Sequence, residues 1–190
     1  NRKRIREDLM KYGDSLVIAG SKSRAKIHIH TNEPAKVFNY CNDYGTVSDQ
    51  KTDDMRKQQA SADGKSLQKI AIVTDSGADL PLESENLNIH VVPVRYHFGN
   101  IGYIDKVSQS PSEFFQELKT NPIHPKTSQP TPGDFRRQYQ FLSTHYKSVI
   151  SIHLSKKLSG TYQSAQTASK RVPESSTTLI DSMSASVSQG

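Results

Sequence analysis

Hydroxyl and carboxyl side chains gather after predicted strands and before predicted helices in the second half of this chain. A serine or threonine hydroxyl can donate a hydrogen bond to an anionic oxygen. The free backbone N–H groups and the dipole at the start of a helix favour the same negative charge. The residues placed in this way are Asp75, Ser76, Thr127, Ser128, Ser159, Asp181 and Ser182. The pattern predicts a site that binds an anionic group of a ligand.

Each of these residues also has a simpler explanation. Serine and threonine are preferred helix N-caps, so Thr127, Ser159 and Ser182 could serve only to begin helices. Asp75 and Asp181 could be capping carboxylates in the same way. The convergence of three or four such loops on one edge of a sheet is what favours a binding site over a set of caps.

A third interpretation is covalent catalysis, which needs a serine beside a histidine and an acid. The sequence has no G-x-S-x-G elbow, and His153 lies within a predicted strand. The spacing of the other histidines assigns none of them as a base. We therefore expect binding by hydroxyl donors, and we do not expect this chain to be a complete enzyme by itself.

The elements that must position these residues alternate between strands and helices. The expected strands are 70–73, 89–94, 149–154 and 178–181, with a hairpin over 96–104, and the expected helices are 111–118, 132–146 and 160–171. Such alternation predicts an α/β fold with a mostly parallel sheet. Ligands of these folds gather at the carboxyl ends of the strands. The short apolar run 70–73 is typical of a buried parallel strand.

The first 59 residues form a separate, smaller α/β pattern. A helix is expected to end near Gly13, followed by a buried strand over 15–19, an alternating strand over 25–30 and a helix that begins at Pro34. The alternation places Ile27 and Ile29 on one face of their strand and the two flanking histidines on the other. Residues 60–68 are small and polar and are predicted to form a linker. The chain is therefore divided into 1–59, a linker 60–68, and 69–190.

Composition excludes several classes of protein. The 190 residues carry a net charge of +6, but the single dense basic run, Arg2–Arg6, has no interleaved aromatic residues, so nucleic acid is not the expected partner. No apolar run approaches the ~18 residues of a transmembrane span, and no signal peptide opens the chain. Cys41 is the sole cysteine, which excludes an intramolecular disulfide and favours the cytoplasm. The absence of an initiator methionine suggests a piece of a longer protein.

Residues 69–190 resemble the DegV family of bacterial fatty-acid-binding proteins. The matching stretches are 70–81 (IAIVTDSGADLP), 91–93, 127–130 (TSQP), 158–165 (LSGTYQSA) and 181–190 (DSMSASVSQG). The family usually has a glycine where Ser188 stands. The resemblance implies that Ser159 and Thr127 bind the fatty acid carboxyl group, that Asp105 lies nearby, and that a second lobe completes the acyl tunnel. The expected ligand residues are Ser159, Thr127, Ser128, Gly160, Asp105, Asp75 and Ser76.

Residues 1–59 resemble the end of the middle domain of fatty acid kinases, which are relatives of dihydroxyacetone kinase. The matching stretches are 12–20 (YGDSLVIAG), 27–34 (IHIHTNEP) and 53–58 (DDMRKQ). The two resemblances together imply a natural fusion. In it, a bound fatty acid would be presented to a kinase nucleotide-binding domain, in cis or in trans. That missing domain would use ATP and Mg²⁺ to make an acyl phosphate.

The kinase resemblance also associates His28 and His30 with a zinc site. Their i, i+2 spacing puts both imidazoles on one strand face, which suits a first-row metal. The cysteine ligand of the family would fall upstream of Asn1, and Cys41 could replace it only if its helix packs beside the strand. The alternative is a pair of solvent-facing histidines.

Two other functions stay open. The chain could be a dihydroxyacetone- or triose-kinase-type subunit, which would need a small polar pocket where a lipid binder needs a long apolar tunnel. It could also be an anion sensor without enzymatic activity.

Overall fold

The computed structural model describes residues 2–21, 23–53, 55, 69–81, 84, 87 and 89–190. The predicted linker 60–68 lies outside the described residues. The described part contains three sheets, of which one is parallel and two are antiparallel. The predicted α/β class is confirmed.

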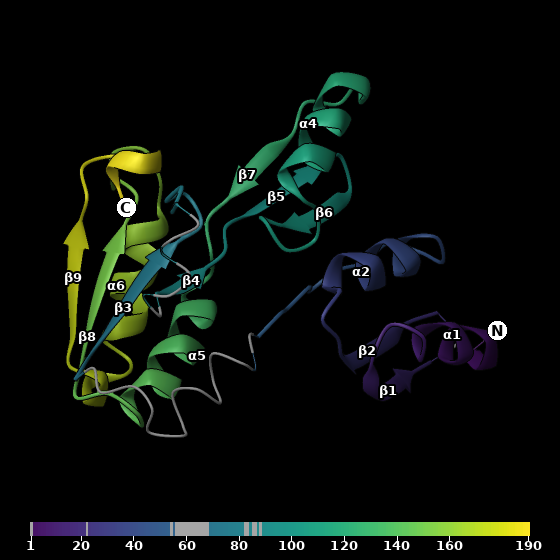
Figure 1. The fold of residues 1–190 in the computed structure, drawn as a ribbon, viewed down its shortest axis with the longest axis horizontal. Coiled ribbons are helices and arrows are strands. Elements are labelled where there is room, and N and C mark those ends of the chain that lie inside the picture. The colour runs from purple at the N-terminus through teal and green to yellow at the C-terminus, as the bar shows by residue number, and fades with distance from the viewer. Residues whose placement is uncertain are drawn as a thin grey trace.

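The four-stranded parallel sheet is the centre of the second half of the chain. Its strands are β3 (Ile70–Asp75), β4 (His90–Val92), β8 (Ser148–His153) and β9 (Thr177–Asp181), in the order β4-β3-β8-β9. All neighbouring pairs are parallel, and Figure 1 shows β3, β8 and β9 pointing the same way. The loops that follow these strands therefore meet at one edge, as the alternation of elements predicted.

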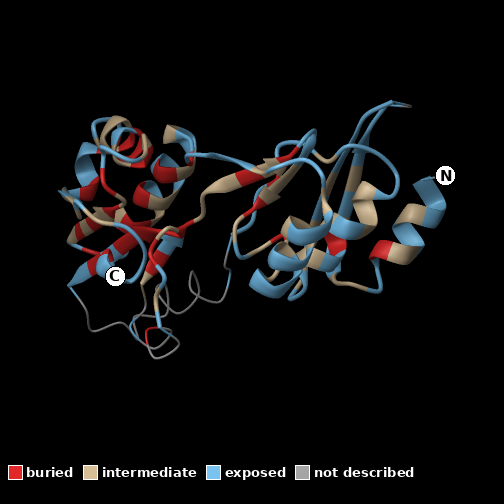
Figure 2. Ribbon diagram, turned by 90° about the horizontal axis from the view of Figure 1, so that it is seen from above, coloured by how far each residue is buried: buried red, intermediate tan, exposed pale blue. Residues whose placement is uncertain are grey.

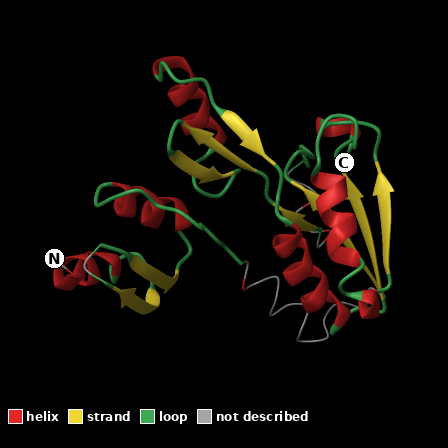
Figure 3. Cartoon of the chain, turned by 180° about the vertical axis from the view of Figure 1, so that it is seen from behind, coloured by secondary structure: helices red, strands yellow, loops and turns green. Residues whose placement is uncertain are grey.

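Two helices cover one face of this sheet. They are α5 (Pro132–Ser143) and α6 (Thr161–Ser169), both shorter than predicted at their carboxyl ends. Figure 3 shows them in front of the strands, whereas in Figure 1 they lie behind. Among the described residues, no helix has the length and apolar character to cross a membrane.

The hydrophobic core lies between the sheet and these two helices. Ala71, Val73 and Val149 contribute the strand side, and Phe135 and Tyr139 the helix side. Burial of each large side chain contributes about 1.5–3 kcal/mol. Figure 2 shows buried residues concentrated in this part of the chain.

The expectation of a fully buried strand at 70–73 is wrong for one of its faces. Ile70 and Ile72 are 45% and 38% exposed. Alternate side chains of a strand point to opposite faces, and the two helices contact the face that carries Ala71 and Val73.

A second sheet with its own helix follows β4. It contains β5 (Arg95–Phe98), β6 (Ile101–Ile104) and β7 (Lys126–Ser128) in the order β6-β5-β7, all antiparallel, and α4 (Pro111–Thr120) packs beside it. Tyr96, Phe98, Tyr103 and Phe114 form an aromatic cluster between the hairpin and α4. The hairpin was predicted. The sequence predicts a loop directly before the helix at 132, whereas the structure has the strand β7 there, with all three side chains exposed.

The first 45 residues contain α1 (Arg2–Leu9), β1 (Asp14–Gly20), β2 (Ala25–His30) and α2 (Pro34–Asn42). β1 and β2 form a two-stranded antiparallel sheet. The predicted burial of the strand at 15–19 is wrong, since every residue of β1 is exposed or half-buried. In a two-stranded sheet each strand has only one neighbouring strand, so most of its surface is open to solvent.

Candidate ligand-binding site

The loops after β3, β8 and β9 are hydrogen-bonded to one another at the carboxyl edge of the parallel sheet. The N–H of Ser155 donates to the carbonyl oxygen of Ser184 (3.0 Å), and the N–H of Ser186 donates to that of Gly77 (3.0 Å). Asp181 belongs to the same network, because one of its carboxylate oxygens accepts from the N–H of Lys156 at 3.2 Å. The structure therefore brings three of the hydroxyl-rich segments together.

Ser159 lies at the amino end of α6 and is half-buried. Its Oγ accepts a hydrogen bond from the N–H of Thr161 (3.2 Å) and lies 2.9 Å from the Oγ1 of Thr161. The N-cap position itself is Gly160, which has no side chain to cap the helix. Ser159 is therefore not the N-cap of α6, although its hydroxyl accepts from the N–H of the first residue of that helix. Its hydroxyl proton can also be donated to a ligand oxygen.

Thr127 and Ser128 are exposed residues of β7, opposite Tyr96 and Arg95 of β5. Neither caps α5. That role belongs to Thr131, whose hydroxyl accepts from the N–H of Asp134 in a reciprocal capping box. The capping explanation for Thr127 is therefore wrong, and its hydroxyl is presented by a strand.

Gln129 joins the strand β7 region to the start of α6. Its side-chain Nε2 lies 3.4 Å from the Oγ of Ser164. A Cβ atom added to Gly160 would collide with the amide group of Gln129. The amide end of Gln129 therefore lies against Gly160, so the Thr127 and Ser159 segments are neighbours.

Asp75 is fully buried, and its carboxylate accepts hydrogen bonds from several of the loops at this edge of the sheet. Its Oδ1 accepts from the N–H of Gly77 (3.0 Å), and its Oδ2 accepts from the N–H of Leu154 (3.0 Å) and from Nε2 of Gln189 (3.1 Å). Oδ2 also lies 3.0 Å from Nδ1 of His153. Burial raises the pKa of Asp75, but the hydrogen bonds from His153 and Leu154 outweigh it and lower the pKa.

His153 continues the network into the core. Its Nε2 lies 2.7 Å from the Oγ of Ser151, which lies 2.8 Å from the hydroxyl of Tyr139. With the proton on Nδ1, the imidazole donates to Asp75, accepts from Ser151, and lets Ser151 accept from Tyr139. This neutral tautomer satisfies every member of the chain.

Ser151 contacts His153, and His153 contacts Asp75, which is the arrangement of a serine–histidine–aspartate catalytic triad. All three residues, however, are fully buried. A substrate cannot reach the Ser151 oxygen, so the network positions loops. The partnership of His153 with Asp75 joins residues 78 positions apart and was not predicted from the sequence. The available signal was the alternation in SVISIH, which puts Ser151 and His153 on one strand face.

Ser76 and Asp105 link the parallel sheet to the hairpin. The Oγ of Ser76 accepts from the N–H of Val94 (3.0 Å), and the N–H of Asp105 donates to the carbonyl oxygen of Val94 (3.0 Å). Ser76 is buried and Asp105 is half-buried. Asp105 is also near enough to Tyr96 for its negative charge to add to the effect of burial, which raises the pKa of Tyr96.

Lys106 is a further residue of this edge that the sequence analysis did not single out. Its Nζ donates to the carbonyl oxygen of Ser76 (3.0 Å) and pairs with Asp79 (2.9 Å). Asp79 also accepts from the hydroxyl of Ser186 at 2.7 Å. The hydrogen bonds from Ser186 and Lys106 lower the pKa of Asp79. A cation thus lies beside the loops after β3 and β9.

Large apolar side chains are exposed on the same loops. Leu158 is 70%, Met183 is 82% and Val187 is 71% exposed. Leu158 directly precedes Ser159, and the other two follow β9. The polar groups of this edge therefore have apolar neighbours that a long hydrocarbon chain could contact.

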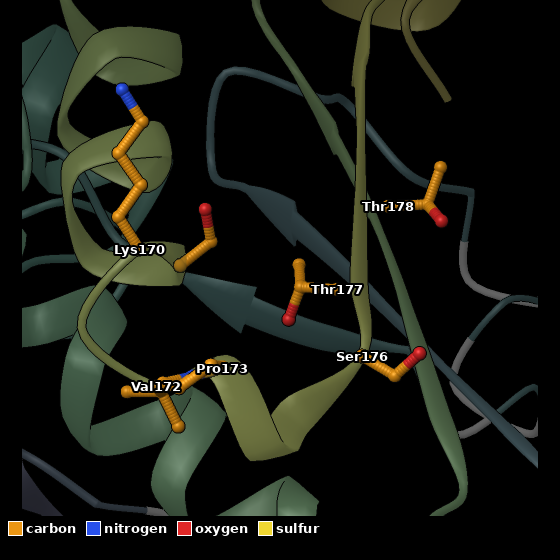
Figure 4. A pocket seen from close by; sticks show the side chains of 7 residues that line it. Lys170, Val172, Pro173, Ser176, Thr177 and Thr178 are labelled. Carbon is orange, nitrogen blue, oxygen red and sulfur yellow. The ribbon is translucent and has the colours of Figure 1, made fainter.

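A hollow of about 350 Å³ lies elsewhere in the described part of the chain. It is lined by Ser169, Lys170, Val172, Pro173, Ser176, Thr177 and Thr178. Figure 4 shows it between the carboxyl end of α6 and the beginning of β9. This is the opposite end of β9 from the hydroxyl-rich loops, so the hollow is separate from the candidate site.

His28 and His30 lie on one face of β2, with ring centroids 5.1 Å apart. Nδ1 of His30 is 3.7 Å from a carboxylate oxygen of Asp14. Within the described ranges, no group of three or more histidine, cysteine, aspartate or glutamate residues could hold a metal ion. The two histidines alone fall short of the four ligands of a structural zinc site.

Two family models match the sequence in separate ranges. Residues 69–190 match the model described as uncharacterised protein, DegV family. Residues 1–62 match the model of the middle domain of fatty acid kinase-like proteins. Both of the resemblances inferred from the motifs are confirmed.

Individual relatives and solved structures agree with the first match. A DegV domain-containing protein of Halalkalibacterium halodurans is 46% identical over 106 residues, which are 55% of this chain and 38% of that protein. The structure titled as a fatty acid binding DegV family protein from Thermus thermophilus has 38% identity and a TM-score of 0.58, covering 63% of this chain and 43% of its own. That of DegV, a fatty acid binding protein from Bacillus subtilis, has 36% identity and a TM-score of 0.61, covering 64% and 44%. The chain thus spans less than half the length of these relatives.

Proposed function

The chain belongs to the DegV family through residues 69–190, and from this premise we propose that it binds a fatty acid by its carboxylate. The contact of Gln129 with Gly160 carries this proposal, because it places the Thr127 and Ser159 hydroxyls on neighbouring segments. Two relatives with solved structures are titled as fatty acid binding.

The carboxylate would be held by donors. Thr127, Ser128 and Ser159 supply hydroxyl protons, and Gly160 marks the start of α6, where the helix dipole favours a negative charge. Hydrogen bonds of this kind, to a charged acceptor, contribute about 1.5–3 kcal/mol each.

Three acidic or polar residues act indirectly in this proposal. Asp75 and Ser76 are buried and hold the loops, through Leu154 and Val94 respectively. Asp105 is connected to Ser76 through Val94: the N–H of Asp105 donates to the carbonyl oxygen of Val94, and the N–H of Val94 donates to Ser76. Their part is to keep the donors in place before the ligand arrives, which lowers the cost of binding.

The apolar side chains beside the donors favour a lipid over a small polar substrate. Leu158, Met183 and Val187 are each more than two thirds exposed, and their contact with an acyl chain would remove apolar surface from water. A triose of the dihydroxyacetone kinase type offers no such surface. This alternative would need polar partners where these three residues lie.

The match of residues 1–62 to a fatty acid kinase-like middle domain supports a further step. The bound carboxyl group would be presented to a kinase nucleotide-binding domain, in cis or in trans, for phosphorylation by ATP with Mg²⁺. The phosphoryl transfer itself belongs to that domain. We also propose a division into 1–59, a linker 60–68 and 69–190, and a cytoplasmic location, which the lone Cys41 favours.

Isothermal titration calorimetry with oleate tests the proposed site, because it measures the Kd directly. Ser159→Ala should weaken binding by roughly 1–3 kcal/mol, about 5- to 150-fold in Kd, because a donor to a charged oxygen is lost. Ser143→Ala, at the far end of α5, is the matched control and should leave the affinity unchanged. An unchanged affinity of the Ser159 variant, with the fold intact, would place Ser159 among ordinary helix-supporting residues.

A further inference from the structure

Gln50 belongs to the kinase-like match, but its side chain is buried against residues of the DegV match. Its Nε2 donates to the carbonyl oxygen of Gly102 (2.6 Å), and its Oε1 accepts from the hydroxyl of Ser108 (2.9 Å). These partners are 52 and 58 positions away in the sequence. Both ends of a buried amide are thus satisfied by the other half of the chain.

The partners of Gln50 lie on both sides of the loop that carries Asp105. Gly102 is in β6, and Ser108 follows it. The hydroxyl of Ser108 also accepts from the N–H of Ile104 at 2.9 Å. Gln50 therefore connects the two ends of this loop through its side-chain amide.

A second connection runs from Gln50 towards Ser128. Nη2 of Arg95 lies 3.5 Å from the backbone carbonyl oxygen of Gln50. Arg95 is opposite Ser128 in the β5–β7 pair, and its guanidinium pairs with Asp134 at 2.6 Å. Asp134 in turn completes the capping box of α5 with Thr131.

The contact continues beyond Gln50. Lys51, Thr52 and Asp53 line a cavity of about 230 Å³ together with Val92, Arg95 and Asp134. Residues 51–53 of the kinase-like match thus lie beside β4, β5 and the start of α5, and β5 is the strand that pairs with Thr127 and Ser128.

We propose that Gln50 couples the kinase-like segment to the ligand loops of the DegV lobe, so that fatty acid binding and the docking of residues 48–53 strengthen each other. This inference rests on the proposed fatty acid site. Its physical basis is that Gln50 touches the Asp105 loop directly and the Thr127–Ser128 strand through Arg95. Ordering of either side reduces the conformational freedom that the other must lose.

Reciprocity separates coupling from a simple structural contact. If docking of residues 48–53 favours fatty acid binding, fatty acid binding must favour docking by the same factor. A contact that only stabilises the fold would not respond to the ligand. The response of residues 48–53 to fatty acid is therefore the decisive observable.

Hydrogen exchange of the whole chain, with and without saturating oleate, measures this response. Oleate should slow exchange of the 48–53 and 102–108 backbone amides about 5-fold or more, the lower range of measured couplings. In Gln50→Ala and in Ser108→Ala the slowing at 48–53 should be lost, and oleate should bind more weakly by a similar factor. Gln140→Ala, an exposed glutamine of α5, is the control and should behave as the unmodified protein.

Two results would overturn the proposal. Protection of 127–129 and 158–161 by oleate, with unchanged exchange at 48–53, would leave the fatty acid site intact and remove the coupling. No protection of any segment would refute the fatty acid site, and the coupling with it.

Discussion

Replacement of Asp75 by asparagine tests the buried network that supports the candidate site. The Asp75 carboxylate lies within hydrogen-bonding distance of four donors, one on Oδ1 and three on Oδ2. Asparagine keeps the size but turns one acceptor into an NH₂ donor. The best orientation keeps its oxygen at the Oδ2 position and faces the N–H of Gly77 with another donor.

The magnitude follows from these contacts. One hydrogen bond to a charged acceptor is lost, at about 1.5–3 kcal/mol, and the remaining three become neutral and weaker. We therefore expect Asp75→Asn to lower the free energy of unfolding by about 2–4 kcal/mol at pH 7. Asp43→Asn, at an exposed position, should change it by less than about 0.5 kcal/mol.

The pH dependence gives the effect a signature. The pKa of Asp75 is lowered in the folded protein, so its ionised form stabilises the fold above the unfolded pKa of about 3.9. This stabilisation is lost as the pH falls through the folded pKa. The part of the difference that comes from the Asp75 charge should therefore shrink below about pH 4.

Urea unfolding followed by circular dichroism, from pH 3 to 8, measures these differences. A variant within 0.5 kcal/mol of the unmodified protein at pH 7 would show that the Asp75 contacts contribute little. A difference that stays constant down to pH 3 would assign the destabilisation to shape rather than to charge.

Two further predictions concern the site and the first half of the chain. Gly160→Ala should displace the flexible end of the Gln129 side chain. We expect the free energy of unfolding to fall by less than about 1 kcal/mol and the oleate affinity measured by calorimetry to decrease. An unchanged affinity would mean that the Gln129–Gly160 contact does not shape the site. If zinc is held through His28 and His30 with further ligands, His28→Ala should lower the zinc content found by elemental analysis, because one of the coordinating imidazoles is removed. A zinc content that this substitution leaves unchanged would remove the two histidines from the metal site.

The parallel sheet could be predicted because its signals are local. The run that forms β3 is short and mostly apolar, β8 alternates polar and apolar residues, and the strands are separated by segments with helix-starting prolines or glycines. Parallel strands place their carboxyl ends at one edge, so the meeting of the Ser76, Ser159 and Ser182 loops followed from the order of elements.

The strand β7 could not be predicted, because its stability is not encoded in its own residues. Lys126, Thr127 and Ser128 are all exposed, and they form a strand because β5 offers them an unpaired edge. The presence of that edge depends on the tertiary fold. From the sequence alone, Thr127 is expected in a loop before a helix and could be its cap, whereas the N-cap of α5 is Thr131.

The contacts made by His153 and Gln50 depend on residues far away in the sequence. His153 meets Asp75 across 78 positions, and Gln50 meets Ser108 across 58. No periodicity spans such distances, and a single glutamine or histidine carries no signal of its partner. These two residues nevertheless determine how the loops of the candidate site are held.

Native mass spectrometry of the natural protein as purified from its cells tests the central claim most directly. Our account predicts a population with the added mass of a fatty acid, and its loss or marked reduction in Thr127→Ala/Ser159→Ala. A protein that carries no fatty acid and takes up none when mixed with oleate would contradict the account.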